Sequence, residues 1–241
     1  MNIALIIAAG VGARMGQDIP KQFLPVYEKP VIVYTMEAFQ RHKDIDEIVI
    51  SCLDGWEVPL RAYAKQFGIA KLSTIVPGGA TGQESIFNGI SAIAKNHSEE
   101  DIILIHDAIR PNVSERIISN CINTTKEKGN AITIIPCNEV MLTTEDSKSS
   151  KAAYDRDKLK RTQTPQTVKL GKLIELHKRA KEQGITNSVA TCSLMTELGE
   201  TVFFCDGSTK NIKLTTVDDI DIFKALLKAE RSDWIKESEN I

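Results

Sequence analysis

Glycines and cationic residues follow the first apolar run of the chain. Residues 8–16 read AAGVGARMG, and Lys21 follows shortly after. Glycine lets the backbone approach a ligand closely, and successive backbone N–H groups can cradle phosphate oxygens. With Arg14 and Lys21 inside or beside it, such a cradle suits a triphosphate that loses pyrophosphate. The alternative is a tight turn that carries two surface cations.

The spacing of these glycines argues against two familiar nucleotide-binding loops. A dinucleotide fingerprint requires G-x-G-x-x-G, whereas Gly10, Gly12 and Gly16 are spaced G-x-G-x-x-x-G. No acidic residue ends a second strand at the expected place. A Walker A loop requires a lysine directly after its last glycine, and none follows Gly16. A nicotinamide-dependent dehydrogenase is therefore disfavoured.

A second glycine-containing segment follows a strand-like run that ends at Val76. Gly78 and Gly79 would let a planar group approach the backbone. Ser85 stands near the start of an expected helix, where its hydroxyl can donate or accept a hydrogen bond. The segment therefore favours a loop that recognises a nucleotide base, with a plain turn as the alternative.

A third motif, HDAIRP at residues 106–111, comes directly after an apolar run. An aspartate at the end of a strand beside a phosphate cradle is a natural Mg²⁺ ligand, which is the expectation for Asp107. The guanidinium of Arg110 can hold a phosphate through two hydrogen bonds. We interpret His106 as structural, because a phosphate nucleophile is already ionised near neutral pH and needs no strong base.

The surrounding elements must bring these motifs together. Apolar runs predict strands at residues 3–9, 47–52, 71–76, 101–106, 131–136 and 201–205. Helical spacing of apolar residues predicts helices at 31–40, 59–67, 84–95, 114–128, 169–183, 188–198 and 217–229. Ser114 is expected to cap the fourth of these helices, and Ile222 to face inward in the last.

This alternation of strands and helices predicts an α/β fold. We expect a Rossmann-like, mainly parallel sheet with helices on both of its faces. In such open sheets, ligands bind at the carboxyl ends of the strands. The three motifs follow strands directly, so they should converge at that edge.

The alternation breaks between residues 137 and 161, where the sequence is polar and has Ser, Lys and Asp at its centre. This segment predicts a projecting β-hairpin, with a mobile surface loop as the alternative. A hairpin with few apolar residues is marginal alone, so it should pack on something, for which a second subunit is a candidate. With no repeat or linker elsewhere, we expect one domain, residues 1–241, that carries an arm.

Composition sets limits on the class of protein. The net charge of −2 over 241 residues gives no basic field for nucleic acid. No apolar run approaches the ~20 residues that a membrane span needs, and no signal peptide is expected. Five cysteines without C-x-x-C spacing are typical of reduced thiols in the cytoplasm. We expect His42, His97 and His177 to be surface residues.

Together, the motifs resemble those of the cytidylyltransferases of sugar-alcohol phosphates. The resemblance spans residues 3 to about 229 and rests on AAGVGARMG, PKQF, GG with a following ES-I-NG, HDAIRP, QTPQ and NIKLTT. One branch of this family makes CDP-methylerythritol from methylerythritol 4-phosphate in isoprenoid synthesis. The other makes CDP-ribitol from ribitol 5-phosphate for teichoic acids and capsules. The resemblance implies CTP as substrate, Mg²⁺ as cofactor, and a cytoplasmic homodimer in which the 137–161 arm crosses to the partner subunit.

The resemblance also implies roles for individual residues. CTP would be bound by Ala8, Ala9, Gly10, Gly12, Gly79, Ala80, Ser85 and Ala108. The catalytic set would be Arg14, Lys21 and Lys213, which stabilise the α-phosphate and the departing pyrophosphate, and Asp107, which faces the metal. The alditol phosphate would be held by Arg110, Arg156, Thr164 and Thr191.

The chain departs from the usual family pattern at three places. Gly82 replaces an arginine, Glu139-Val140 replaces Asp-Thr, and Val189-Ala190 replaces Thr-Asp. The last two departures are on the acceptor side. With QTPQT, TCSL and NIKLTT, they favour ribitol 5-phosphate as acceptor, and methylerythritol 4-phosphate is the alternative. A non-catalytic nucleotide-binding homologue is a second alternative, against which the intact cationic residues argue.

Overall fold

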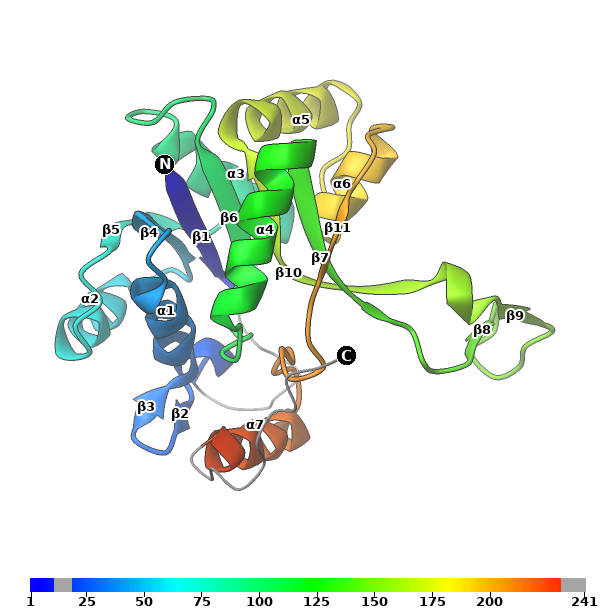
Figure 1. Cartoon of the computed structure of the whole chain (residues 1–241), viewed down its shortest axis with the longest axis horizontal. Coiled ribbons are helices and arrows are strands. Elements are labelled where there is room, and N and C mark those ends of the chain that lie inside the picture. Colours follow the sequence, from blue (N-terminus) through cyan, green and yellow to red (C-terminus); the bar gives the residue numbers. More distant parts are fainter. Residues whose placement is uncertain (11–18, 231–241) are drawn as a thin grey trace.

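A seven-stranded sheet forms the centre of the molecule (Figure 1). The computed structural model describes residues 1–10 and 19–230. Across the sheet the strands are β11 (Phe204–Asp206), β7 (Asn130–Pro136), β10 (Lys160–Lys169), β6 (Ile102–Asp107), β1 (Asn2–Ala8), β4 (Glu47–Cys52) and β5 (Leu72–Pro77). Pairs that include β10 are antiparallel and the other pairs are parallel. The predicted α/β fold with a mainly parallel sheet is confirmed.

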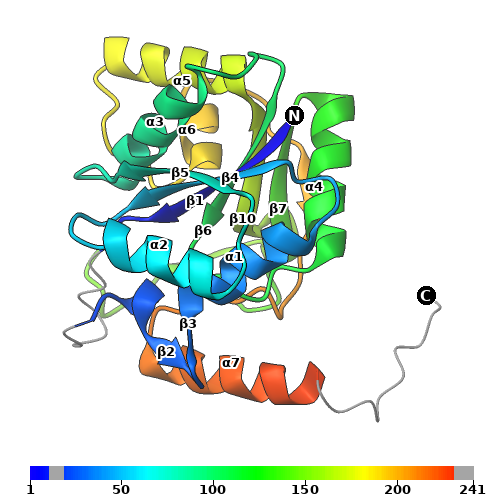
Figure 2. The ribbon, with the colours of Figure 1, turned by 90° about the vertical axis from the view of Figure 1, so that its left-hand side faces the viewer.

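Helices cover both faces of this sheet, which explains why its strands are apolar at consecutive positions. In β1, Ala4 and Ile6 pack into one core cluster, and Ile3 and Leu5 pack into a second cluster on the opposite face. Figure 2 shows the two layers of helices on either side of the sheet. The first layer consists of α1 (Val31–Arg41), α2 (Glu57–Gln66) and α4 (Glu115–Lys128), and the second of α3 (Gly82–Ile93), α5 (Leu170–Glu182) and α6 (Thr191–Glu197).

A third, smaller cluster holds the last helix against the rest of the fold. Helix α7 (Val217–Glu230) buries Phe223 against the short hairpin of β2 (Pro25–Val26) and β3 (Lys29–Pro30). Leu214 belongs to the same cluster, and its backbone N–H donates to the carbonyl of Ile109 at 2.9 Å. The cluster therefore fixes the segment around Lys213 beside the HDAIRP loop. Contrary to expectation, Ile222 is 51% exposed on the outer face of α7.

The helix termini follow local capping chemistry. Ser114 caps α4 as predicted, since its Oγ accepts a hydrogen bond from the backbone N–H of Ile117. Helix α3 begins at Gly82, before the predicted start at residue 84, because the hydroxyl of Thr81 accepts from the N–H of Glu84. Helix α6 is shorter than predicted, and β11 begins three residues later than its predicted strand.

Strand β10 is absent from the sequence-based prediction. Its sequence, KRTQTPQTVK, has no run of apolar residues, although it pairs with both β6 and β7 inside the sheet. The buried glutamines Gln163 and Gln166 satisfy their amides with nearby backbone and side-chain groups. Polar side chains that are hydrogen-bonded inside the fold hide this strand from a hydrophobic pattern.

Residues 137–161 form a projecting arm, as Figure 1 shows. Strands β8 (Met141–Thr143) and β9 (Ala152–Tyr154) pair antiparallel near its tip, and the 3-10 helix η3 (Arg156–Lys158) follows. Residues 138–158 are all exposed. The exposed residues include Val140, Leu142 and Tyr154, with exposed fractions of 73%, 62% and 59%. The arm therefore presents apolar surface that the described part of its own chain does not cover.

The histidine prediction is wrong for two of the three residues. His42 and His177 are only 3% and 6% exposed. The ring of His42 is held by the backbone N–H of Asp44 and by the hydroxyl of Ser119, which is distant in the sequence. His97 is also largely covered and pairs with Glu47. All five cysteines are buried and free, as expected of structural thiols.

One further observation concerns membranes. Within residues 1–10 and 19–230, the structure contains no helix with the length and apolar character needed to cross a bilayer.

The contact between α3 and β1 generates a stability prediction. A Cβ added at Gly89 would collide with the buried side chain of Leu5, whereas one added at Gly82, in the same helix, meets nothing within 4 Å. We expect Gly89→Ala to lower the free energy of unfolding by about 1–2 kcal/mol, because overpacking outweighs the gain in helix propensity. Gly82→Ala is the matched control and should leave it unchanged or raise it. Urea denaturation measures both, and equal values for the two variants would contradict the close packing at Gly89.

Candidate active site

Three loops meet at the carboxyl edge of the parallel strands. In the sheet register, Ile7 of β1 lies opposite Asp107 of β6, and Ala8 lies opposite Cys52 of β4, which pairs with Pro77 of β5. The loops that follow these strands therefore leave the sheet at the same level. This is the convergence that the sequence predicted for ligand-binding motifs.

A pocket of about 460 Å³ opens between these loops. Its lining includes the following residues from the predicted CTP-binding and catalytic sets: Ala8, Ala9, Gly10, Lys21, Gly79, Ala80, Ser85, Asp107, Ala108 and Lys213. Asp107 is the one carboxylate among the described lining residues, which also include Lys21 and Lys213. The two lysines bring positive charge to the pocket, which suits a polyphosphate.

The glycine pair after β5 is required by close packing. A side chain at Gly78 would collide with Ala9, and the N–H of Gly78 donates to the carbonyl of Cys52 at 2.7 Å. The N–H of Gly79 donates to Ser85 Oγ at 3.0 Å, and that of Ala80 donates to Glu84 Oε2 at 2.7 Å. Ser85 and Glu84, both at the start of α3, therefore fix the shape of this loop against the pocket.

Gln22 is a site residue that sequence reasoning missed. Its side chain is 1% exposed, and its Nε2 donates to the carbonyls of Ala8 at 2.8 Å and Gly10 at 3.0 Å. These two carbonyls belong to the first glycine loop, so Gln22 fixes where that loop leaves β1. The available signal was the PKQF motif, which contains Gln22 directly after Lys21.

Asp107 lies between two cations. Arg110 Nε donates to its Oδ2 at 3.0 Å, and Lys213 Nζ lies 3.2 Å from both carboxylate oxygens. Burial opposes ionisation of Asp107, but the charges of Lys213 and Arg110 outweigh it and hold the pKa of this carboxyl below its usual range. The carboxylate in turn holds the two cations close together, where their charges would otherwise repel.

His106 is structural, as predicted. The ring is fully buried, and burial lowers its pKa to about 4, so it is neutral near pH 7. Its Nε2 donates to the carbonyl of Arg110 at 3.0 Å, and its Nδ1 accepts from the hydroxyl of Thr164 at 3.0 Å. The same hydroxyl accepts from the N–H of Asp107 at 3.1 Å. Both ring nitrogens are occupied in holding the loop around Asp107.

A second pocket of about 200 Å³ adjoins the first. Three of the predicted acceptor-binding residues, Arg110, Thr164 and Thr191, line it, and it shares Asp107 and Lys213 with the larger pocket. The hydroxyl of Thr191 is buried and has no hydrogen-bond partner among the described residues. An unpaired buried hydroxyl at a pocket wall is a group that a polar ligand can satisfy.

The junction of the two pockets is held from behind by a hydrogen-bonded pair that sequence reasoning also missed. Asn211 is fully buried, and its Nδ2 donates to the carbonyl of Thr164 at 2.9 Å and to Gln163 Oε1 at 3.3 Å. The backbone carbonyl of Asn211 accepts from Arg110 Nη1 at 2.8 Å and from the side-chain amide of Gln163 at 3.3 Å. Asn211 therefore ties β10 to the segment that carries Lys213, which makes Asn211 and Gln163 positioning residues.

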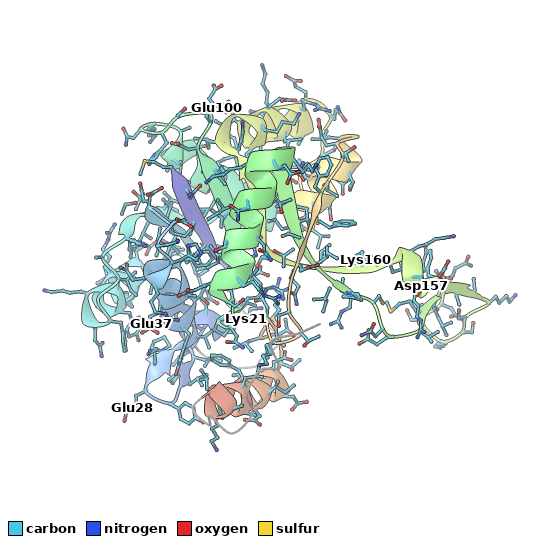
Figure 3. The ribbon with its side chains drawn as sticks, viewed as in Figure 1. Lys21, Glu28, Glu37, Glu100, Asp157 and Lys160 are labelled. Atoms are coloured by element: carbon cyan, nitrogen blue, oxygen red, sulfur yellow. The ribbon has the colours of Figure 1, made fainter. Side chains whose placement is uncertain are left out.

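One predicted acceptor-binding residue, Arg156, is not brought to this site. Arg156 lies on the exposed arm, where its Nη1 donates to the carbonyl of Asn138 at 3.3 Å. In Figure 3, the neighbouring Asp157 lies at the far end of the arm from Lys21, which marks the site. Gly12 and Arg14 are outside the described residues, so their roles stay predictions.

The comparison with known proteins identifies the family. The family model for 2-C-methyl-D-erythritol 4-phosphate cytidylyltransferase matches residues 2–229 of this chain. The chain belongs to this family. It is a cytidylyltransferase, an enzyme of the nucleotidyltransferase class, as the sequence motifs predicted.

Three curated relatives agree with this assignment over nearly the whole chain. A ribitol-5-phosphate cytidylyltransferase of Lacticaseibacillus paracasei is 43% identical, over 95% of this chain and 98% of its own length. Another protein of that name, from Vibrio parahaemolyticus, is 40% identical over 96% and 98%. A 2-C-methyl-D-erythritol 4-phosphate cytidylyltransferase of Clostridium acetobutylicum is 36% identical over 95% and 98%.

Solved structures give the same result for the fold. A crystal structure of 4-diphosphocytidyl-2C-methyl-D-erythritol synthase matches 94% of this cytidylyltransferase and 98% of its own chain, with a TM-score of 0.77 at 26% identity. The substrates of the cytidylyltransferase are CTP and a phosphorylated alcohol. Two adjoining pockets meet at Asp107 and Lys213.

The buried histidines generate a prediction about pH. Burial lowers the pKa of both His106 and His177 to about 4. The unfolded chain, with a histidine pKa near ~6.5, therefore takes up protons first as the pH falls, and stability is lost between these values. From pH 7 to 5.5 we expect each histidine to lower the free energy of unfolding by about 1 kcal/mol. In His177→Phe the fall measured by urea denaturation should be smaller by about that amount, and an equal fall would contradict a neutral buried ring.

Proposed function

We propose that this enzyme transfers CMP from CTP to ribitol 5-phosphate and forms CDP-ribitol and pyrophosphate. The observation that carries the reaction is the junction of the two pockets at Asp107 and Lys213. The choice of acceptor is supported by similarity, which is 43% and 40% to relatives named for ribitol 5-phosphate and 36% to one named for 2-C-methyl-D-erythritol 4-phosphate.

The acceptor pocket adds a physical argument for ribitol 5-phosphate. Val189 and Ala190 line this pocket, and neither carries a carboxylate or hydroxyl. The family pattern noted above has Thr-Asp at these positions. Alanine in place of aspartate removes a negative charge and leaves room for the unbranched five-carbon chain of ribitol, which is longer than the methyl-branched four-carbon chain of methylerythritol. Arg110, Thr164 and Thr191 remain available for the phosphate and the hydroxyl groups of the acceptor.

The reaction then follows from the arrangement of charges. CTP binds along the first glycine loop, with its base at the Gly79–Ser85 loop and its α-phosphate near Lys213. An oxygen of the acceptor phosphate attacks the α-phosphorus in line, the new P–O bond forms, and the bond to the β-phosphate oxygen breaks as pyrophosphate leaves. Lys21 and Lys213 stabilise the charge on the transferring and departing groups, and Asp107 orients Lys213.

We also propose Mg²⁺ as the cofactor. Mg²⁺ is commonly bound by one or two carboxylates together with substrate phosphates. The described residues contain no cluster of three or more histidines, cysteines or acidic side chains that would form a complete metal site. Asp107, as the one carboxylate in the described lining of the pocket, fits the role of a single protein ligand. When bound, the ion would withdraw negative charge from phosphate oxygens.

A homodimer is the third part of the proposal. The exposed apolar residues of the arm, among them Leu142 and Tyr154, need a surface to cover them. Arg156 is remote from the pockets of its own chain, yet it is expected to hold an acceptor phosphate. Both points are accounted for if the arm of each subunit reaches the acceptor pocket of its partner.

The acceptor is tested by measuring pyrophosphate release with CTP and Mg²⁺ against a panel of acceptors. The panel holds ribitol 5-phosphate, methylerythritol 4-phosphate, erythritol 4-phosphate and glycerol 3-phosphate. We expect kcat/KM for ribitol 5-phosphate to exceed the others by at least about tenfold, since an unpaired polar group in the pocket costs ~1–3 kcal/mol. A preference for methylerythritol 4-phosphate would reject the proposed acceptor. Tight CTP binding without turnover of any acceptor would favour a non-catalytic homologue.

The shared site is tested by mixing two inactive variants. Lys21→Ala removes a cation from the nucleotide pocket, and Arg156→Ala removes one from the arm. After random exchange, half of the dimers contain one subunit of each variant. If each site combines the body of one subunit with the arm of its partner, such a dimer carries one intact site. Activity should then return to about a quarter of the wild-type value after subunit exchange.

The control for this experiment replaces the Arg156→Ala subunit with the double variant Lys21→Ala/Arg156→Ala. No site in that mixture contains both residues, so activity should stay absent. Failure of the first mixture to regain activity, with exchange verified by mass spectrometry, would show that the arm does not complete the partner's site.

A further inference from the structure

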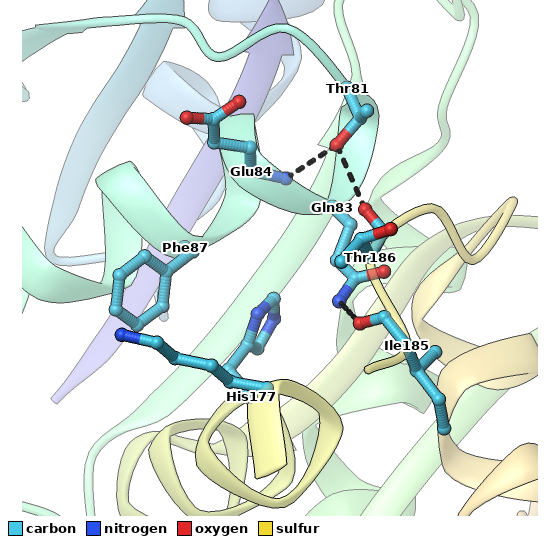
Figure 4. A pocket seen from close by; sticks show the side chains of 8 residues that line it. Thr81, Gln83, Glu84, Phe87, His177, Ile185 and Thr186 are labelled. Carbon is cyan, nitrogen blue, oxygen red and sulfur yellow. Dashed lines mark hydrogen bonds between the residues drawn. The ribbon is translucent and has the colours of Figure 1, made fainter. Parts of the chain in front are cut away.

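A pocket outside the two substrate pockets lies between helices α3 and α5. Its cavity volume is about 360 Å³, near the lower limit for small-molecule sites. Figure 4 shows Phe87 from α3 and His177 from α5 pointing toward one another across it, with Ile185 on the far side. The two rings stack with centroids 5.6 Å apart. The pocket therefore has aromatic and aliphatic walls suited to a flat apolar group.

His177 is the polar feature that points to a ligand. The residue is 6% exposed, and its ring lines the pocket without a hydrogen bond to any residue in the described part of the chain. Burial lowers its pKa to about 4, so near pH 7 the neutral ring carries one N–H donor and one acceptor nitrogen. A histidine with so little exposed surface normally has hydrogen-bond partners for its ring nitrogens, and here the pocket is where a partner can be supplied.

Charge at the two ends of the pocket indicates how a ligand would lie. Glu84 lines the end formed by α3, and its carboxylate accepts from the N–H of Ala80. Lys181 lines the end formed by α5, one turn after His177, and is exposed. A negative group on a ligand is therefore repelled by the α3 end and attracted to the α5 end, where the N–H of His177 can also donate to it.

The walls of this pocket are connected to both substrate pockets. Thr81 lines this pocket and the nucleotide pocket, and its hydroxyl donates to the carbonyl of Thr186 at 3.4 Å. Gln83 Nε2 donates to the carbonyl of Ile185 at 2.8 Å, and its Oε1 accepts from the N–H of Ser188 at 2.8 Å. Ser188 itself lines the acceptor pocket.

We propose that this pocket binds a small aromatic carboxylate, with its ring against Phe87 and Ile185 and its carboxylate between His177 and Lys181. The bound molecule contacts Thr81 and Gln83, so its binding is energetically linked to that of CTP. The site is separate from the reaction, and its occupancy does not depend on which alditol phosphate is the acceptor.

The test uses sodium benzoate as the probe and the full chain without acceptor. Benzoate has about nine non-hydrogen atoms, which predicts a Kd on the order of 1 mM by titration calorimetry and saturation-transfer NMR. Benzyl alcohol, the neutral analogue, should bind at least about tenfold more weakly because it lacks the charge. Absence of saturable benzoate binding up to roughly 10 mM would overturn the proposal.

Three variants locate the probe. His177→Phe keeps an aromatic ring but removes both nitrogens, and we expect it to weaken benzoate binding about tenfold. Lys181→Met keeps the length of the side chain but removes its charge, and should weaken binding about threefold. Lys178→Met, on the same helix but outside the pocket, is the matched control and should bind as the wild type does. Unchanged binding in Lys181→Met, or in a folded His177→Phe, would contradict the assignment.

Linkage is measured by repeating the titration at saturating CTP. Benzoate should still bind, with a Kd altered by at least about threefold, and it should change the Kd of CTP by the same factor. Complete displacement of benzoate by CTP would place the probe in the nucleotide pocket and refute the second site. An identical Kd with and without CTP would refute the linkage. These readouts use no turnover, so they fail or succeed independently of the proposed acceptor.

Discussion

The ion pairs of Asp107 with Arg110 and Lys213 are the interaction on which the site depends. The positive charges of Arg110 and Lys213 would repel each other at this separation, and the carboxylate between them offsets the repulsion. Both cations still line the pockets. Each of these residues comes from a segment with its own anchor. His106 fixes the loop of Asp107, and Asn211 fixes the segment of Lys213. A ligand phosphate then meets charges that are already oriented, which is the condition for electrostatic catalysis without reorganisation.

The antiparallel strand β10 is what allows this arrangement. A strand parallel to β6 would end at the edge of the sheet where the site lies. The antiparallel strand β10 instead comes from the arm and passes the site in the opposite direction. It thereby delivers Gln163 and Thr164 to the back of the site, where both contact Asn211. The same strand continues outward as one side of the arm, so the arm and the site are parts of one element (Figure 1).

Sequence reasoning predicted the parts of the fold that hydrophobic pattern controls. The strands β1, β4 and β6 carry apolar runs because helices bury both faces of the sheet, and the loops after β1 and β6 carry motifs. This pattern predicted that Gly79 and Asp107 would lie at the same edge of the sheet, and both line the larger pocket there. Hydrophobic pattern could not reveal β10, because its buried residues include Gln163 and Gln166, whose side-chain amides find their partners only in three dimensions.

The histidines show the same limit for single residues. His177 stands among charged residues in the sequence and was predicted to be exposed, but α5 turns its ring inward against Phe87. Gln22 and Asn211 were missed because their side-chain amides are uncharged and are not nucleophiles or acids at neutral pH. Their role is visible only from the backbone carbonyls to which they donate hydrogen bonds. The positions of Gly12 and Arg14 lie outside the described residues, so their expected roles rest on the motif alone.

The two halves of the site differ in how they are built, and this difference bears on specificity. The proposed nucleotide half consists of strand ends and of loops whose backbone is held by hydrogen bonds, as from the N–H of Gly79 to Ser85 Oγ, so changes there disturb the sheet itself. The proposed acceptor half includes the loop before α6, where Val189 is 94% exposed. Substitutions in that loop cost the core little. A fold that binds CTP in one way can therefore accept different alditol phosphates through changes confined to residues such as Val189 and Ala190.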